Sequence, residues 1–148
     1  MFKQFIQNKK LPLIMLSIVF FVICVFYAVK TAPWSHPDEF GHFSYIKYLQ
    51  QNASLPSYTS PYDFWEAHQP PLYYMSLLPT TMLFSNHSID TQLIAVRIFN
   101  VLFGIANIWV LWAIFKHIAK TYISSKKAQH LFTYVTTAVA SFWPMFVY

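Results

Sequence analysis

Three long stretches without a charged residue constrain this chain more than any other feature of its sequence. They cover residues 11–29, 98–115 and 131–148, and each is 18 or 19 residues long. A helix rises about 1.5 Å per residue, so each stretch can cross a hydrocarbon core of about 30 Å. We therefore predict an all-α membrane protein with three transmembrane helices.

The composition agrees with a membrane protein and excludes other classes. Hydrophobic residues make up 56% of the 148 residues and charged residues only 10%, against about a quarter in soluble domains. This apolar content excludes a disordered chain, and a single cysteine, Cys24, excludes a disulfide scaffold. The net charge of +5 does not indicate nucleic-acid binding, because the basic residues flank the uncharged stretches and form no single stripe.

The first uncharged stretch has an alternative interpretation as a cleaved signal peptide. It is longer than the apolar region of about 7–15 residues that signal peptides contain. It also ends in Tyr-Ala-Val-Lys at residues 27–30, which is a poor cleavage site. An uncleaved span fits the stretch better.

The distribution of lysines predicts the orientation in the membrane. Residues 71–84 are apolar, but this segment is short and contains Pro79, so it suits an interfacial helix better than a span. With three spans, two groups of lysines lie on the cytoplasmic side, as the positive-inside rule requires: Lys3, Lys9 and Lys10, and Lys116, Lys120, Lys126 and Lys127. We expect a plasma-membrane protein with a cytoplasmic N-terminus and a long loop, residues 30–97, in the periplasm or outside the cell.

The outer loop is expected to contain two helices at the membrane surface. Ser35 as N-cap and Pro37 in the first turn predict a helix that runs to about Gln51. Its apolar residues recur near the helical period: Phe40, Phe43, Tyr45, Ile46 and Leu49. Residues 57–63 are expected to form a turn, and residues 71–84 a second helix that lies along the membrane.

Asp38 and Glu39 are the first candidates for chemistry. Carboxylates near a membrane surface could act as a general base or bind a cation, although the helix dipole also favours acids in a first turn. His42 lies four residues after Asp38 on the same helical face. It could orient a proton carrier, share a metal ion or make an ordinary polar contact. The sequence therefore identifies no metal site and no cofactor, and it leaves open whether a divalent cation binds.

A polar segment before a Pro-Pro dipeptide contains further candidates. Pro70 and Pro71 hold an extended backbone, so the polar side chains before them have a fixed direction. These side chains are Glu66, His68 and Gln69. Tyr73 could contact a membrane interface or stack on a sugar, and the alternative for the whole segment is a linker with interfacial aromatic residues. Arg97 could bind a phosphate through two hydrogen bonds, or it could anchor the second span at the interface.

Taken in order, these motifs resemble the N-terminal part of GT-C glycosyltransferases. They are His-Pro-Asp-Glu-Phe-Gly-His-Phe at residues 36–43, Leu-Pro at 55–56, Glu-Ala-His-Gln-Pro-Pro-Leu-Tyr-Tyr at 66–74, and then Arg97. The sequence is most similar to bacterial polytopic relatives of dolichyl-phosphate-mannose protein mannosyltransferases and of lipid A aminoarabinose transferases. The resemblance extends over about residues 10–148.

The resemblance implies transfer of a sugar from a polyprenyl-phosphate donor to an acceptor on the outer face of the membrane. Asp38 would be the catalytic base, with Glu39 beside it, and Arg97 would contact the donor phosphate. The other candidates for substrate contacts are His42, Glu66, His68, Gln69 and Tyr73. Many relatives have Lys or His directly before Pro-Pro, where this chain has Gln69.

The resemblance also implies that residues 1–148 are part of a larger GT-C domain. Relatives have more spans than this chain, so we expect an N-terminal portion that is inactive alone. The alternative function is a small non-enzymatic multi-pass scaffold or assembly subunit. A transporter would need ionisable residues within its spans. The three uncharged stretches contain no Asp, Glu, Lys or Arg, which counts against this function.

Overall fold

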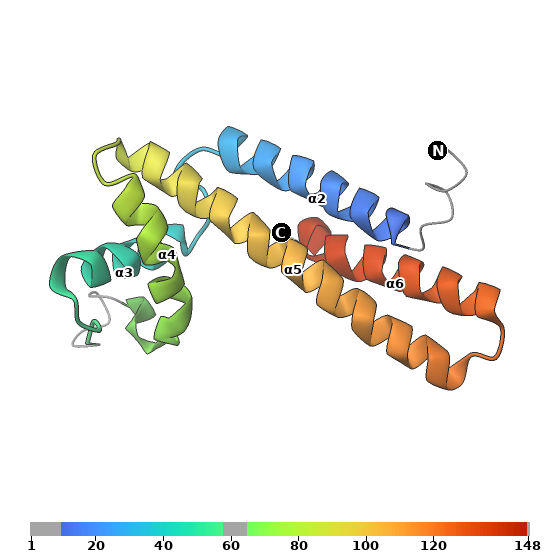
Figure 1. Ribbon diagram of the computed structural model, residues 1–148. Coiled ribbons are helices and arrows are strands. Elements are labelled where there is room, and N and C mark those ends of the chain that lie inside the picture. The colour runs from blue at the N-terminus through green and yellow to red at the C-terminus, as the bar shows by residue number, and fades with distance from the viewer. Residues whose placement is uncertain (1–9, 58–64, 148) are drawn as a thin grey trace. The chain divides into compact units, whose positions relative to one another are not determined.

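The computed structural model of the chain describes residues 10–57 and 65–147, and these residues are helical without any strand. This confirms the predicted all-α class. Figure 1 shows the order of the elements, which are α2 (Leu11–Lys30), α3 (Glu39–Asn52), the 3-10 helix η1 (Trp65–His68), α4 (Pro71–Leu83), α5 (Ile89–Tyr122) and α6 (Lys126–Val147). Most of the turn expected at 57–63 lies outside the described residues.

The chain divides into two compact units, and α5 contributes to both of them. We call Phe26–Asn100 the loop unit, since it contains the segment between the first two uncharged stretches. The second unit, which we call the helical unit, consists of Met1–Val25 and Val101–Tyr148. All candidate site residues belong to the loop unit.

Two of the described helices, α2 and α5, are long and apolar enough to cross a membrane. Only 17% of the most apolar window of α2 and 11% of that of α5 is buried, whereas a core helix of a soluble protein would be mostly enclosed. The 34 residues of α5 extend over about 51 Å, which exceeds a hydrocarbon core of about 30 Å. The predicted span 98–115 is therefore the middle of a longer helix.

The third predicted span, 131–148, corresponds to α6, which begins earlier, at Lys126. A larger share of the residues is polar in α6 than in α2 or α5. Its hydroxyl groups donate to carbonyls one turn earlier on the same helix at 2.6–2.7 Å, and these donors are Thr133, Thr136, Thr137 and Ser141. Such bonds satisfy the hydroxyls without a second helix.

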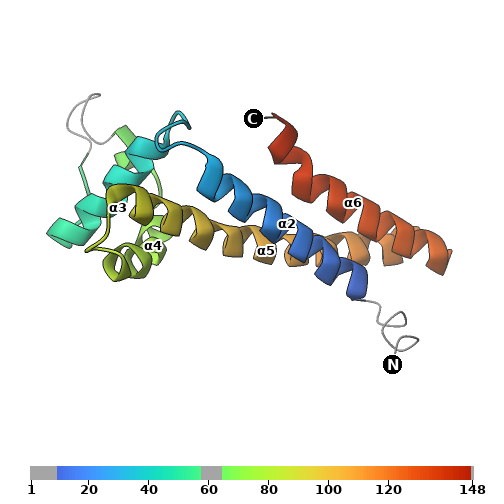
Figure 2. The same ribbon diagram turned by 90° about the horizontal axis from the view of Figure 1, so that it is seen from above.

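In the helical unit, α6 runs back in the direction opposite to α5 after a short link at 123–125 (Figures 1 and 2). α2 packs against α5 at Gly104, where an added Cβ would lie 2.6 Å from the ring of Phe20. A cavity of about 260 Å³ adjoins this contact. A larger residue at 104 would therefore force the Phe20 ring to move.

The core of the loop unit lies between α3, α4 and the beginning of α5. Its buried residues are Phe43, Tyr45, Ile46, Leu49, Tyr74, Leu77, Leu93 and Val96. Four of the five apolar residues expected on one side of α3 are among them. The exception is Phe40, which is 64% exposed and packs edge-on against Trp34 at the start of the helix, with 5.6 Å between ring centroids.

The prediction that Ser35 caps α3 is wrong. Its hydroxyl donates to Ala32 O at 2.7 Å, and Trp34 has a positive φ of 63° between them. The helix begins at Glu39, after Asp38 in the N-cap position. The start is later than predicted because the Glu39 carboxylate accepts the Trp34 N–H at 2.9 Å, which holds the preceding segment in a turn.

The end of α3 and the extent of α4 agree with the sequence. α3 ends at Asn52, and Ala53 has a left-handed backbone with its N–H bonded to Leu49 O. α4 begins at Pro71, as expected after the extended Pro70, and includes Pro79. One side of α4 contributes to the core, while its remaining large apolar residues are exposed: Leu72, Tyr73, Met75, Met82 and Leu83.

Candidate functional site

Arg97, in the third turn of α5, is the centre of a hydrogen-bond network in the loop unit. Its Nε and Nη2 donate to the two carboxylate oxygens of Glu39 at 2.6 and 2.7 Å. Its Nη1 and Nη2 also donate to three backbone carbonyls at 2.7–3.1 Å, those of Ala28, Thr31 and Ala32. Arginine has five N–H donors, so each of them has a partner. We call this network the Arg97 clamp.

The clamp joins three elements through charge and hydrogen bonds. The carbonyls belong to the end of α2 and the residues after it, where a helix leaves backbone acceptors unpaired and favours a cation. The side chains of Arg97 and Glu39 are each only 12% exposed. Burial by itself would raise the pKa of Glu39, but the hydrogen bonds and charge of Arg97 and the Trp34 N–H lower it below its ordinary value. Glu39 is therefore held as a carboxylate.

These contacts change the expected roles of Glu39 and Arg97. Glu39 was a candidate for catalysis beside Asp38, but both of its carboxylate oxygens accept hydrogen bonds within the clamp. Arg97 was a candidate for the donor phosphate, but a phosphate could contact it only by replacing a present partner. Through these hydrogen bonds both residues hold the segments around the site together, and their roles in catalysis and phosphate binding stay predictions.

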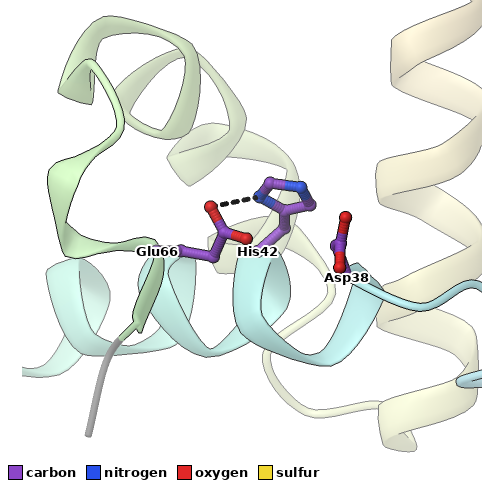
Figure 3. A group of neighbouring side chains, drawn as sticks. All are labelled: Asp38, His42 and Glu66. Atoms are coloured by element: carbon purple, nitrogen blue, oxygen red, sulfur yellow. Dashed lines mark ion pairs between the residues drawn. The ribbon is translucent and has the colours of Figure 1, made fainter. Parts of the chain in front are cut away.

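A second group of side chains comes together beside the clamp, formed by Asp38, His42 and Glu66. One oxygen of each carboxylate and one ring nitrogen of His42 all lie within 4.8 Å of one another. Figure 3 shows the imidazole between the two carboxylates, with Asp38 at the start of α3 and Glu66 on η1. The packing of η1 against α3 brings Glu66 to this position. We call this group the Asp38–His42–Glu66 cluster.

Glu66 is the most buried member of the cluster, with 3% of its surface exposed. Its Oε2 has no hydrogen-bond partner among the described residues, and the nearest ion-pair partner is His42 Nδ1 at 3.8 Å. Asp38, by contrast, is exposed. The cluster therefore has a closed side at Glu66 and an open side at Asp38.

Tyr74 orients the imidazole of the cluster. Its ring is stacked on Tyr45, with 3.9 Å between centroids, and its hydroxyl shares a 2.8 Å hydrogen bond with His42 Nδ1. Burial raises the pKa of Tyr74, and the negative charge of Glu66 raises it further. The hydroxyl thus stays protonated and can donate to His42.

The remaining candidates lie outside the cluster. Gln69 and His68 contact each other through their Nε2 atoms at 3.3 Å. The Tyr73 hydroxyl accepts a hydrogen bond from Asn100 Nδ2 at 2.9 Å. The expectation that these three side chains contact a substrate stays a prediction.

Two parts of this arrangement were not predicted from the sequence. Tyr74 was part of the Pro-Pro-Leu-Tyr-Tyr motif, and its spacing from Leu77 could have identified it as a core residue of α4. That its hydroxyl meets His42 depends on how α3 packs against α4. The carbonyls in the Arg97 clamp have no signal in the sequence, because any residue supplies a backbone carbonyl.

Comparisons of the chain with protein-family models, with curated proteins and with solved structures each find no match.

Proposed function

We propose that this chain carries the first outer-loop site of a membrane glycosyltransferase that uses a polyprenyl-phosphate sugar. The observation that carries the proposal is the contrast between two adjacent acids. Glu39 is bound by Arg97, whereas Asp38 is exposed, makes no side-chain capping hydrogen bond and lies beside His42 and Glu66. An accessible carboxylate that does not cap its own helix suits a general base.

In the proposed reaction, Asp38 accepts the proton of an acceptor hydroxyl or amine as that group attacks the anomeric carbon of the sugar. The bond from the anomeric carbon to the phosphate oxygen breaks, and its electron pair leaves with the polyprenyl phosphate. A base in this role contributes about 10²–10⁴ in rate. The Arg97 clamp supports the reaction indirectly, because it fixes Glu39 and hence the start of α3, next to Asp38.

The proposal includes three spans and a partial GT-C fold in the plasma membrane. α2 and α5 have the required length and apolarity. In α6, hydroxyls bonded to the backbone of their own helix reduce the number of unsatisfied polar groups in lipid. With the lysines around the α5–α6 link on the cytoplasmic side, the loop unit faces outward, where a polyprenyl-linked donor would be met.

The test is the substitution Asp38→Asn in the full-length natural protein. We expect loss of sugar transfer by about 10²-fold or more, since asparagine cannot accept the proton. Protein abundance should change little, because asparagine is an equally good N-cap residue. Transfer from a polyprenyl-phosphate sugar is measured in isolated membranes, with protein level determined by immunoblot and Asp90→Asn, an exposed acid of α5, as the matched control.

Near-normal transfer by Asp38→Asn would contradict a base at this position. It would instead favour the non-enzymatic membrane scaffold that the sequence also allows.

A further inference from the structure

We propose that the Asp38–His42–Glu66 cluster binds a divalent first-row transition-metal ion such as Mn²⁺ or Zn²⁺. Binding itself depends only on the cluster and not on the proposed sugar transfer. The first argument is the set of donors. Two carboxylates and one imidazole supply oxygen and nitrogen ligands of the kinds that bind these ions, and thiolates are absent from the cluster.

The second argument is the unsatisfied oxygen of Glu66. A carboxylate that is 97% enclosed by the protein normally has hydrogen-bond partners, because burying an unpaired charge is costly. Glu66 Oε2 has no such partner among the described residues, and it lies 3.8 Å from His42 Nδ1 (Figure 3). A cation between these groups would supply the missing partner.

Arg97 does not pair with the cluster, because its five N–H groups are bonded within the clamp. Glu66 and Asp38 place two carboxyl groups around one imidazole. This donor set suits a divalent ion.

The geometry requires only a small adjustment. Bonds from such ions to carboxylate oxygen and imidazole nitrogen are about 2.0–2.2 Å long, so three donors around one ion lie about 3–4 Å apart. The donor atoms here lie within 4.8 Å of one another. Rotation of the exposed Asp38 side chain can close that difference, and the buried Glu66 and the Tyr74-bound His42 need not move far. An ion bound at His42 Nδ1 would take the lone pair that now accepts from the Tyr74 hydroxyl, so that hydroxyl would turn to another acceptor.

Three protein ligands leave coordination positions open on the Asp38 side. An open position lets a metal ion bind a phosphate oxygen or polarise an attacking group. In the proposed transferase, whose function this last step assumes, the ion would supply the positive charge near the donor phosphate that Arg97 cannot supply while it is clamped.

The experiment measures metal binding directly, on the purified full chain in detergent without a histidine tag and without any sugar donor. Mn²⁺ is titrated while the electron paramagnetic resonance signal of free Mn²⁺ is followed, and Zn²⁺ is titrated by calorimetry. We expect one saturable site. Glu66→Gln and His42→Gln should each weaken it at least about tenfold, a change at the low end of what the loss of even an outer-shell partner causes.

Two control variants and one stability measurement keep the result interpretable. Asp90→Asn and His87→Gln change an exposed acid and an exposed histidine outside the cluster, and both should bind as the unchanged protein does. Glu66→Gln keeps the size of the side chain and removes the buried unpaired charge, so its metal-free melting temperature should be equal or higher. The metal should raise the melting temperature of the unchanged protein but not that of Glu66→Gln.

Absence of a saturable site, equal loss of binding in the controls, or unchanged binding by Glu66→Gln would each overturn the metal site. Overturning the metal site leaves Asp38 as a base. If the site is confirmed, Asp38 binds the ion through one carboxylate oxygen and accepts the proton on the other, and transfer by Glu66→Gln, which keeps Asp38, separates the two roles. Conversely, loss of the transfer proposal would leave a measured metal site in place.

Discussion

At the residue scale, Asp38 and Glu39 are neighbours in sequence but face different surroundings. Glu39 lies in the first turn of α3 and receives hydrogen bonds from Arg97 and Trp34. Asp38 lies one residue earlier and is exposed beside His42. The backbone turns by about 100° per helical residue, which is why one acid faces the clamp and the other faces the cluster.

The Arg97 clamp should be a major source of stability for the loop unit. Removing one partner of a largely buried ion pair leaves the other charge unpaired, and we expect Glu39→Gln to lower the free energy of unfolding by about 3 kcal/mol. Arg97→Lys should be comparably harmful, because an ammonium group cannot reproduce the planar fork. Thermal melting of the purified protein in detergent measures both, with Asp90→Asn as control. A melting temperature of Glu39→Gln equal to that of the unchanged protein would contradict the clamp.

The clamp also predicts how stability depends on pH. The pKa of Glu39 is lower in the folded protein than the ordinary value of about 4.3. The stabilisation is therefore present above about pH 4.3 and is lost as the pH falls through the lower folded pKa. We expect the difference in melting temperature between the unchanged protein and Glu39→Gln to be constant from about pH 5 to 7 and to shrink below about pH 4. A difference that grows on acidification would have the wrong sign.

At the scale of elements, the sequence predicted helices better than contacts. The first uncharged stretch agrees with α2 to within one residue, and residues 71–84 with α4, because long apolar runs and Pro-Pro act locally. The Ser35 cap failed, since the Glu39 carboxylate accepts the Trp34 N–H and holds the segment before α3 in a turn. The cluster was predicted only in part: His42 could be paired with Asp38 by helical spacing, but the approach of Glu66 depends on the packing of η1 against α3.

α4 is expected to lie along the membrane surface with its exposed apolar residues in the lipid. The test uses spin labels at Leu72 and Leu83, which are 77% and 76% exposed, in a Cys24→Ser background reconstituted in liposomes. Both labels should be more accessible to oxygen than to a water-soluble nickel complex, and at similar depth. A helix that crosses the membrane would separate their depths by about 16 Å. A label at Gln51, at the exposed end of α3, is the aqueous control.

At the scale of the whole molecule, the two apolar helices and the lysines predict an orientation in the membrane. α2 and α5 are long enough to cross a membrane, and α5 continues beyond the thickness of a hydrocarbon core into the loop unit. Lysines adjoin the α5–α6 link, whereas the acids of the cluster belong to the loop unit. Under the positive-inside rule, we expect the cluster to lie outside the cytoplasm.

Chemical labelling of intact cells tests this topology. In a Cys24→Ser background, a cysteine at Ser54 in the loop unit should react with a membrane-impermeant maleimide. A cysteine at Ser124, in the α5–α6 link, should react only after the membrane is opened. Both serines are exposed, so a difference reports the side of the membrane. Labelling at Ser124 in intact cells would refute a cytoplasmic link.

The Arg97 clamp also has a consequence for the biogenesis of the protein. Arg97 is made 58 residues after Glu39 and 69 residues after Ala28, yet it bonds to both. While the ribosome is still translating the loop, the end of α2 and the start of α3 lack the cation that joins them. The loop unit can therefore form the clamp only once the beginning of α5 has been synthesised. Completion of that part of α5 and assembly of the clamp are thus coupled, and a chain that stalls before Arg97 lacks the contact that fixes the start of α3.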